Sequence, residues 1–471
     1  MSAFRGVNRI GGVTLHHCPI VRWDCGESTE MVSMSKVKIG NGEVVLDFWT
    51  EIPLAAQQIL IILIGLLGGA LANYGIYRFA YFQPRLISPW GPLPSGVTRG
   101  WFDRIPVLGW WGLRRESEMH GSGFWVRPML IELLMPLGLL WLYQFEILDR
   151  GLWPPEIRRV EVISGYSQSA NTIFFTHLLL IILMTAATFI DFDERTIPDV
   201  ITIPGTCVGL LLATLSAQIY MPTTLFIEGI PFGKPTTFDS PWFDTNDSQL
   251  ASVDALLKAL AIWSIWCFAL ADWRWSPALR RRRGVARAVK HFVNGLFHYG
   301  YWKILFAVWL FGAVGVVSVW GLQGDAWYGL LTGLYGLAVG GGVVWAIRII
   351  ASWALNVEAM GFGDVTLMAM IGTMVGWQAA LIAFFLSPFA AILIVLVRFL
   401  ITRDAYTPFG PYLCAGTLMT IIGWDHWYRL WLSENLLLLG TLLLWFSIAM
   451  LGLMAVMLMV WRQVKIRMLE S

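Results

Sequence analysis

Two aspartates are the strongest candidates for chemistry, because each lies directly beside an apolar run. Asp191 follows the apolar run 172–190, and Asp364 precedes the apolar run 365–377. Acidic side chains beside membrane-length apolar segments are costly and mark functional sites by default. Two carboxyl groups held close together share one proton, because both cannot ionise comfortably. The ionised partner can then activate a water while the protonated partner donates to a carbonyl oxygen, which is peptide hydrolysis without a metal.

The glycines around Asp364 indicate close contact between segments. Gly361 and Gly363 allow the backbone to bend and to approach another segment, as no residue with a side chain could. Gly372 and Gly376 recur four residues apart, a spacing typical of tight helix packing in membranes. We therefore expect Gly361 and Gly363 to provide backbone approach at the site.

The elements that position these residues are membrane helices, because the composition excludes an ordinary soluble protein. Of 471 residues, 57% are hydrophobic and only 14% are charged, against roughly 25% charged in soluble domains. The formal net charge of +2 argues against a nucleic-acid partner. The five cysteines have no paired spacing and suggest no disulfide framework. We predict an all-α polytopic membrane protein whose surroundings are the lipid bilayer.

Apolar runs predict about 11 helical spans, although one of them, 365–377, is short. The runs are 54–80, 128–147, 172–190, 200–220, 253–272, 303–322, 327–352, 365–377, 378–398, 408–424 and 433–461. Basic residues gather in 81–127 and 273–303, which predicts that both stretches are cytoplasmic. Threading the spans from these anchors places the segments 191–199 and 353–364 at the cytoplasmic face, so that Asp191 and Asp364 can meet.

Three stretches around the aspartates carry a family pattern. GFGDVTLMAMIGTMVGW at 361–377 is similar to a GxGD block, with Thr366 where lysine is usual. FIDFDERTIPDVITIP at 189–204 and PFGPYLCAG at 408–416 match two further blocks. Together they resemble the prepilin peptidases, or type IV prepilin leader peptidases, which are GxGD aspartyl proteases of bacterial inner membranes. This resemblance implies that Asp191 and Asp364 are the catalytic pair.

The resemblance extends to the N-terminal region. GLLGGALANYGIYR at 65–78 is similar to a family helix, and FDRIPVLGWWGLR followed by VRPMLIELL is similar to the family's cytoplasmic loop and the helix after it. The implied function is removal of the leader from type IV pilin and pseudopilin precursors, including those of type II secretion, at the cytoplasmic face of the bacterial inner membrane. The implied partners are these precursors and the bilayer. Proteolysis in this family needs no cofactor.

Two departures from the family pattern affect the expected activities. Family members usually bind zinc through two Cys-x-x-Cys pairs in the cytoplasmic loop, but the matching stretch here has no cysteine. We therefore expect no zinc, and we interpret His120 as a surface histidine. The family also methylates the new N-terminal amine, and S-adenosylmethionine is implied only if that activity is retained. The second departure is an insertion at 221–322, which adds two spans between the aspartates.

The apolar runs, the loops and the family motifs together predict how the chain is divided into segments. It comprises an N-terminal extension (1–53), an N-terminal helix pair with a zinc-less loop (54–171), the helix pair of the first aspartate (172–220), the insertion with its basic loop (221–322), the GxGD core helices (323–424) and an additional C-terminal span (425–471).

Other function classes remain open. A presenilin or signal-peptide-peptidase type of protease also uses GxGD, but no Pro-Ala-Leu motif lies near the C-terminus, whereas PFGPYL is present. A proton-coupled transporter would use membrane aspartates as a relay, yet it predicts an internal repeat with paired broken helices, which the sequence lacks. A catalytically inactive scaffold is disfavoured by the intact aspartates and glycines.

Overall fold

The computed structural model describes residues 47–80, 98–153, 166–227, 230–237, 252–270, 301–355, 357, 359–402, 408–428 and 441–470. Several predictions lie outside these residues. They concern most of the N-terminal extension, the basic stretch 273–300 and the acidic stretch 238–251.

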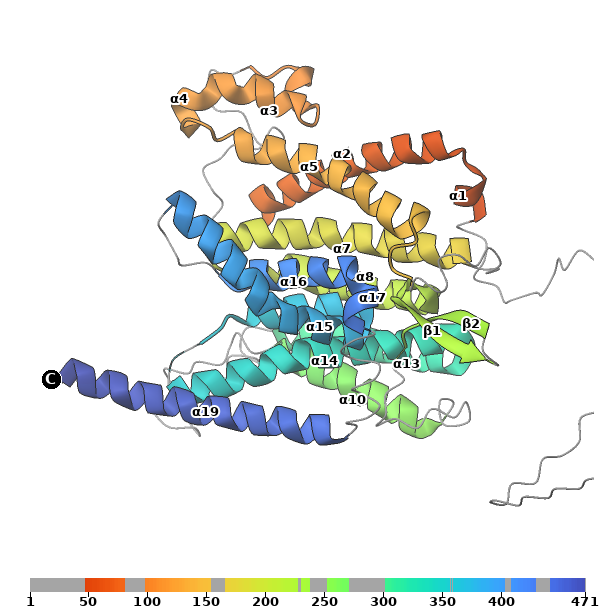
Figure 1. The fold of residues 1–471 in the computed structure, drawn as a ribbon, viewed down its shortest axis with the longest axis vertical. Coiled ribbons are helices and arrows are strands. Elements are labelled where there is room, and N and C mark those ends of the chain that lie inside the picture. The colour runs from red at the N-terminus through yellow and green to blue at the C-terminus, as the bar shows by residue number, and fades with distance from the viewer. Residues whose placement is uncertain are drawn as a thin grey trace, which may run out of the picture. The chain divides into compact units, whose positions relative to one another are not determined.

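Long helices dominate the described part of the chain (Figure 1). Seven of them are long and apolar enough to cross a membrane. They are α2 (Leu54–Phe79), α5 (Val126–Tyr143) with its π-helical extension η3 (Gln144–Leu148), α7 (Tyr166–Glu194), α13 (Tyr301–Leu322), α14 (Gly324–Leu355), α15 (Phe362–Thr402) and α19 (Thr441–Glu470). The shorter helices α8 (Asp199–Leu215), α10 (Val253–Ala269) and α16 (Gly410–Ile422) coincide with further predicted runs. The prediction of an all-α multi-pass membrane protein is confirmed.

Short elements complete the described chain. They are α1 (Asp47–Glu51), η1 (Trp101–Arg104), α3 (Leu108–Leu113), η2 (Arg114–Glu116), α4 (Ser117–His120), η4 (Ala217–Ile219) and α17 (Trp424–Trp427). The elements from η1 to α4 form the loop that leads into α5, and α3 packs on α5 (Figure 1). Helices α2 and α5 pack along each other as the N-terminal pair.

Helix α15 turns back on itself at Gly376, where φ is 84° and ψ is 167°. A Cβ atom placed on Gly340 of α14 would lie 2.5 Å from the carbonyl oxygen of Met368 and 3.5 Å from the Cβ atom of Ala380. Twelve residues of straight helix would separate those two positions by about 18 Å. Residues before and after Gly376 therefore pass the same point of α14 side by side.

The turn also brings both glycines of the expected small-residue seam against Gly336 of α14. Gly372 packs against the backbone of Gly336 so closely that no side chain would fit, as such a seam requires. A Cβ atom on Gly336 would lie 3.4 Å from the Cα atom of Gly376, whose positive φ also makes it the turn itself. The predicted runs 365–377 and 378–398 are the two arms of α15. The first arm is central, since Leu367, Met368 and the residues around them are buried on all sides.

The helices α8, α14, α15 and α16 form the centre of the bundle, and α7 joins this centre to the pair α2–α5. The inserted helices α10 and α13 pack on each other and on α14. Two tryptophans join them: Trp263 donates to the carbonyl oxygen of Trp309 at 3.0 Å, and Trp309 donates to Ser264 at 2.9 Å. Helix α19 also contacts α14, so the added helices lie around the central group.

A β-hairpin follows η4, within a stretch that we expected to be loop. Strand β1 (Pro222–Ile227) pairs antiparallel with β2 (Ile230–Pro235), in the register Pro222 to Pro235 and Ile227 to Ile230. Threonine and isoleucine favour strands, but the acidic residues further along suggested an irregular loop. The indole of Trp424 donates to the carbonyl oxygen of Pro222 at 2.7 Å, which ties the hairpin to the helix bundle.

Candidate active site

Asp191 and Asp364 meet although 172 residues separate them in sequence. Asp191 lies in the last turn of α7, and Asp364 lies in the first turn of α15. Both side chains are buried, with 3% and 8% of their surface exposed. The carboxyl group of Asp364 lies within range of the charge of Asp191. The structure therefore brings together the two aspartates selected from the sequence, and their catalytic role remains a prediction.

The meeting depends on a close backbone contact at Gly363. A Cβ atom at Gly363 would lie 2.8 Å from the Cβ atom of Ile197 and 3.0 Å from its carbonyl oxygen. Ile197 belongs to the short connection between α7 and α8, so the GxGD turn packs directly on the segment that follows Asp191. At Gly361, in contrast, a Cβ atom would make only an ordinary contact, 3.9 Å from Asp364 Oδ2. The close approach is thus at Gly363.

A third segment reaches the site at the beginning of α16. The backbone N–H of Gly410 donates to Asp191 Oδ2 at 3.1 Å, and a Cβ atom at this position would lie 2.6 Å from the same oxygen. The amide groups at a helix N-terminus favour a nearby negative charge. The PFGPYL motif contains Gly410 but predicts no role for it, because a contact between residues 219 positions apart leaves no local signal in the sequence.

Two further residues at the site were missed. Arg348 of α14 donates from Nε to the carbonyl oxygen of Met360 at 3.0 Å. Its guanidinium lies 5.5 Å from the centre of the Phe362 ring and interacts with the charge of Asp364. An arginine inside the apolar run 327–352 was an available signal. Cys414 of α16 lies within electrostatic range of both carboxyl groups.

The motifs near the N-terminus meet around one buried carboxylate. Glu132 of α5 accepts hydrogen bonds from Asn73 Nδ2 at 2.9 Å, from Trp110 Nε1 at 2.9 Å and from the backbone N–H of Val107 at 2.6 Å. Asn73 lies on α2, and the other two donors lie in the loop before α5. Glu132 therefore holds the loop on the helix pair α2–α5.

An ion pair joins this N-terminal unit to the end of α7. Arg127, at the start of α5, donates to both carboxylate oxygens of Asp193 at 2.7 and 2.9 Å. Asp193 is two residues beyond Asp191. The start of α5 and the segment of the first aspartate are therefore connected by this ion pair.

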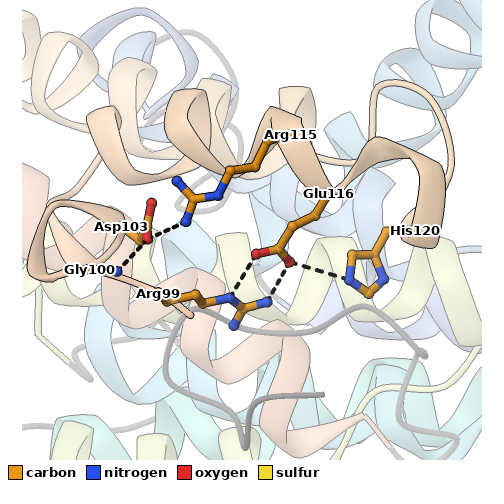
Figure 2. A network of polar contacts seen from close by, with 6 residues as sticks. All are labelled: Arg99, Gly100, Asp103, Arg115, Glu116 and His120. Carbon is orange, nitrogen blue, oxygen red and sulfur yellow. Dashed lines mark hydrogen bonds and ion pairs between the residues drawn. The ribbon is translucent and has the colours of Figure 1, made fainter. Parts of the chain in front are cut away.

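Charged side chains stabilise the loop where the family pattern has cysteines (Figure 2). Arg99 donates to both oxygens of Glu116, at 3.0 Å from Nε and 2.7 Å from Nη2, and both side chains are buried. Arg115 pairs with Asp103 at 2.6 Å. His120 Nε2 lies 3.5 Å from Glu116 Oε2 with only 7% of the side chain exposed, so the interpretation as a surface histidine was wrong. The hydrogen bonds from Arg99 hold the pKa of Glu116 below its ordinary value of 4.5.

This set of residues does not suit zinc. Structural zinc needs four thiolate or imidazole ligands, whereas here guanidinium groups occupy the carboxylates and a single imidazole is present. Among the described residues, no three or more His, Cys, Asp or Glu side chains are grouped to hold a metal ion. The absence of zinc remains a prediction.

Comparison with known proteins identifies relatives of this sequence. The family model of the type IV leader peptidases matches residues 178–233, which include Asp191. A prepilin leader peptidase/N-methyltransferase of Myxococcus xanthus is 30% identical over 156 residues, which cover 33% of this chain and 40% of the relative. Proteins with the same name match from Pseudomonas putida, 29% identical over 140 residues (29% of this chain, 45% of the relative), and from Escherichia coli strain K12, 30% identical over 112 residues (23% and 49%).

The chain spans less than half the length of the curated relatives that it matches. No solved structure matches it. The family to which residues 178–233 are similar is thus that of the type IV leader peptidases.

Proposed function

We propose that this chain is a membrane aspartyl endopeptidase with Asp191 and Asp364 as its catalytic pair. The observation that carries the proposal is the meeting of these two buried carboxyl groups where α7, α15 and α16 converge. The names of the relatives, which are prepilin leader peptidases, support the same reaction.

The chemistry follows from a shared proton. Two carboxyl groups in mutual electrostatic contact hold one proton between them, and their titration belongs to the pair. The ionised carboxylate takes a proton from a water, which attacks the peptide carbonyl carbon. The protonated carboxyl donates to the carbonyl oxygen. As the tetrahedral intermediate collapses, the carboxyl group that took the proton of the water gives it to the nitrogen, a hydroxyl proton of the intermediate returns to the other carboxylate, and the C–N bond breaks to release the amine. The amide of Gly410 orients the Asp191 carboxyl group during this sequence.

The proposed substrates are type IV pilin-like precursors, each with a short leader followed by an apolar helix lying in the membrane. Asp191 lies in the last turn of α7, which is long enough to span the bilayer, and Asp364 lies in the first turn of α15. A pair placed there reaches a peptide bond at the boundary of the bilayer. The basic loops predict that this boundary is the cytoplasmic face of the inner membrane.

Co-expression with a pilin-like precursor tests the function. The wild type is expected to remove the leader, and the N-terminal mass of the product then shows whether a methyl group is added. S-adenosylmethionine is required only if a methyl group is added. An Asp364→Asn variant is expected to leave the precursor intact while still inserting into the membrane. Failure of the wild type to cleave every pilin-like precursor from the same genome would contradict the proposed substrate class.

A further inference from the structure

Two buried threonines join the aspartate-bearing parts of the site at a second point. Thr202 lies in the first turn of α8, and Thr366 lies in the first turn of α15, two residues after Asp364. The hydroxyl of Thr202 donates to the hydroxyl oxygen of Thr366 at 2.9 Å. Thr366 in turn donates to the carbonyl oxygen of Gly363 at 3.1 Å. Both side chains are almost fully buried.

The two hydrogen bonds form a directed relay. Each hydroxyl group has one proton to donate. The hydroxyl of Thr202 donates its proton to Thr366, and the hydroxyl of Thr366 donates its proton to the carbonyl oxygen of Gly363. Helical threonines often bond to a carbonyl three or four residues earlier in their own helix, as Thr206 does with Thr202. The hydroxyl of Thr202 crosses to another helix instead. A buried hydroxyl that loses its partner costs free energy, so this crossing links α8 to α15.

The relay ends on the turn that carries Asp364. Gly363 also packs directly on Ile197, so the same turn is held from two sides by the segment that follows Asp191. We propose that Thr202 and Thr366 are positioning residues, whose hydroxyl relay to Gly363 sets the placement of Asp364 relative to Asp191. The proposal rests on the proposed proteolytic function. It concerns this chain's own sequence, since lysine is usual at the position of Thr366 in the family that it resembles.

The kinetic test removes one hydroxyl at a time. Thr366→Val and Thr202→Val delete a hydroxyl at nearly constant volume. Each is expected to lower kcat for cleavage of a pilin-like precursor about tenfold. KM is expected to stay unchanged, because neither side chain is exposed to a substrate. Thr366→Ser retains the hydroxyl and is expected to restore most of kcat. The double valine variant should be no slower than either single variant, because both remove the same interaction.

Matched controls come from the same two helices. Thr206 and Thr373 are equally buried, and among the described residues their hydroxyls bond only to carbonyls of their own helices, at 2.8 Å to Thr202 and 2.7 Å to Met370. Thr206→Val and Thr373→Val are expected to keep the kcat of the wild type. If they slow cleavage as much as Thr366→Val, the effect is general loss of packing and the proposal is overturned.

A wild-type kcat in Thr366→Val would also overturn the proposal. If the wild-type protein itself cleaves no precursor, the proposed function fails, and the relay is then tested without substrate. Infrared titration of the protein in detergent follows the carboxyl band that disappears in Asp364→Asn. Thr366→Val is expected to shift the midpoint of that band and Thr373→Val to leave it in place. An unshifted midpoint in Thr366→Val would contradict the positioning role.

Discussion

Gly410 places a backbone amide, and no side chain, beside Asp191. A Cβ atom at this position would lie 2.6 Å from Asp191 Oδ2, well inside van der Waals contact. Gly410→Ala must therefore displace the carboxyl group or the start of α16. We expect the cleavage rate to fall about 100-fold, since a displacement of about 1 Å at a reacting group has that effect. Initial rates on a pilin-like precursor measure this loss.

Gly342 on α14 supplies the matched control. A Cβ atom at Gly342 would meet nothing within 4 Å, so Gly342→Ala is expected to keep full activity and to be slightly more stable. Activity of Gly410→Ala equal to that of Gly342→Ala would show that the contact with Asp191 is irrelevant to catalysis.

The two aspartates could be selected from the sequence, whereas the residues that orient them could not. An acid at the end of an apolar run is a local signal. The contact of Gly410 with Asp191 joins residues 219 positions apart, and the contact of Arg348 with Met360 depends on how the chain turns between α14 and α15; no spacing in the sequence encodes either of them. Arg348 is easier than Gly410 to identify from the sequence, because a charge inside an apolar run is itself unusual.

At the scale of elements, the loop before α5 is stabilised by charged side chains where the family pattern has zinc-binding cysteines. The buried pair of Arg99 and Glu116 holds η1 and the turn η2–α4 together (Figure 2). Removing one partner of a buried ion pair leaves the other uncompensated, at a cost of about 3 kcal/mol. We expect Glu116→Gln to lower the hydrogen-exchange protection of residues 98–120 by about 100-fold. Unchanged protection in that variant would rule out the pair as the main support.

Metal and pH dependence follow from the same pair. A chelator is expected to leave the protection of residues 98–120 unchanged, and stoichiometric zinc in the purified protein would refute the expectation of a zinc-free loop.

The folded-state pKa of Glu116 lies below 4.5 because of the Arg99 hydrogen bonds. The pair's stabilisation is therefore fully present above about pH 4.5 and is lost as the pH falls through the lowered pKa.

Predictions of elements succeeded where apolar length decides the structure. Runs such as 172–190 and 327–352 became helices, because a backbone in a bilayer must satisfy its own hydrogen bonds. The reversal at Gly376 could be anticipated only as a boundary between two runs, since a positive φ is set by packing. The hairpin β1–β2 was missed because its strands are short and lie within a polar connection.

At the scale of the whole molecule, the orientation in the membrane rests on the distribution of basic residues. Met119 is exposed in the loop before α5, and Leu322 is exposed at the end of α13. In a variant without native cysteines, Met119→Cys is expected to react with an impermeant maleimide only from the cytoplasmic side. Leu322→Cys is expected to react only from the opposite side. The reverse labelling pattern would show that the topology is inverted and that the carboxyl pair does not lie at the cytoplasmic face.

The most direct measurement of the central claim compares single aspartate variants of the purified protein on one pilin-like precursor. Asp191→Asn and Asp364→Asn are each expected to lower the cleavage rate about 1,000-fold or more, because each removes one half of the acid–base pair. Asp325→Asn, in the exposed first turn of α14, is the matched control and should cleave like the wild type. All three should keep the wild-type thermal unfolding temperature within a few degrees. Near-normal cleavage by either Asp191→Asn or Asp364→Asn would contradict the assignment of the catalytic pair.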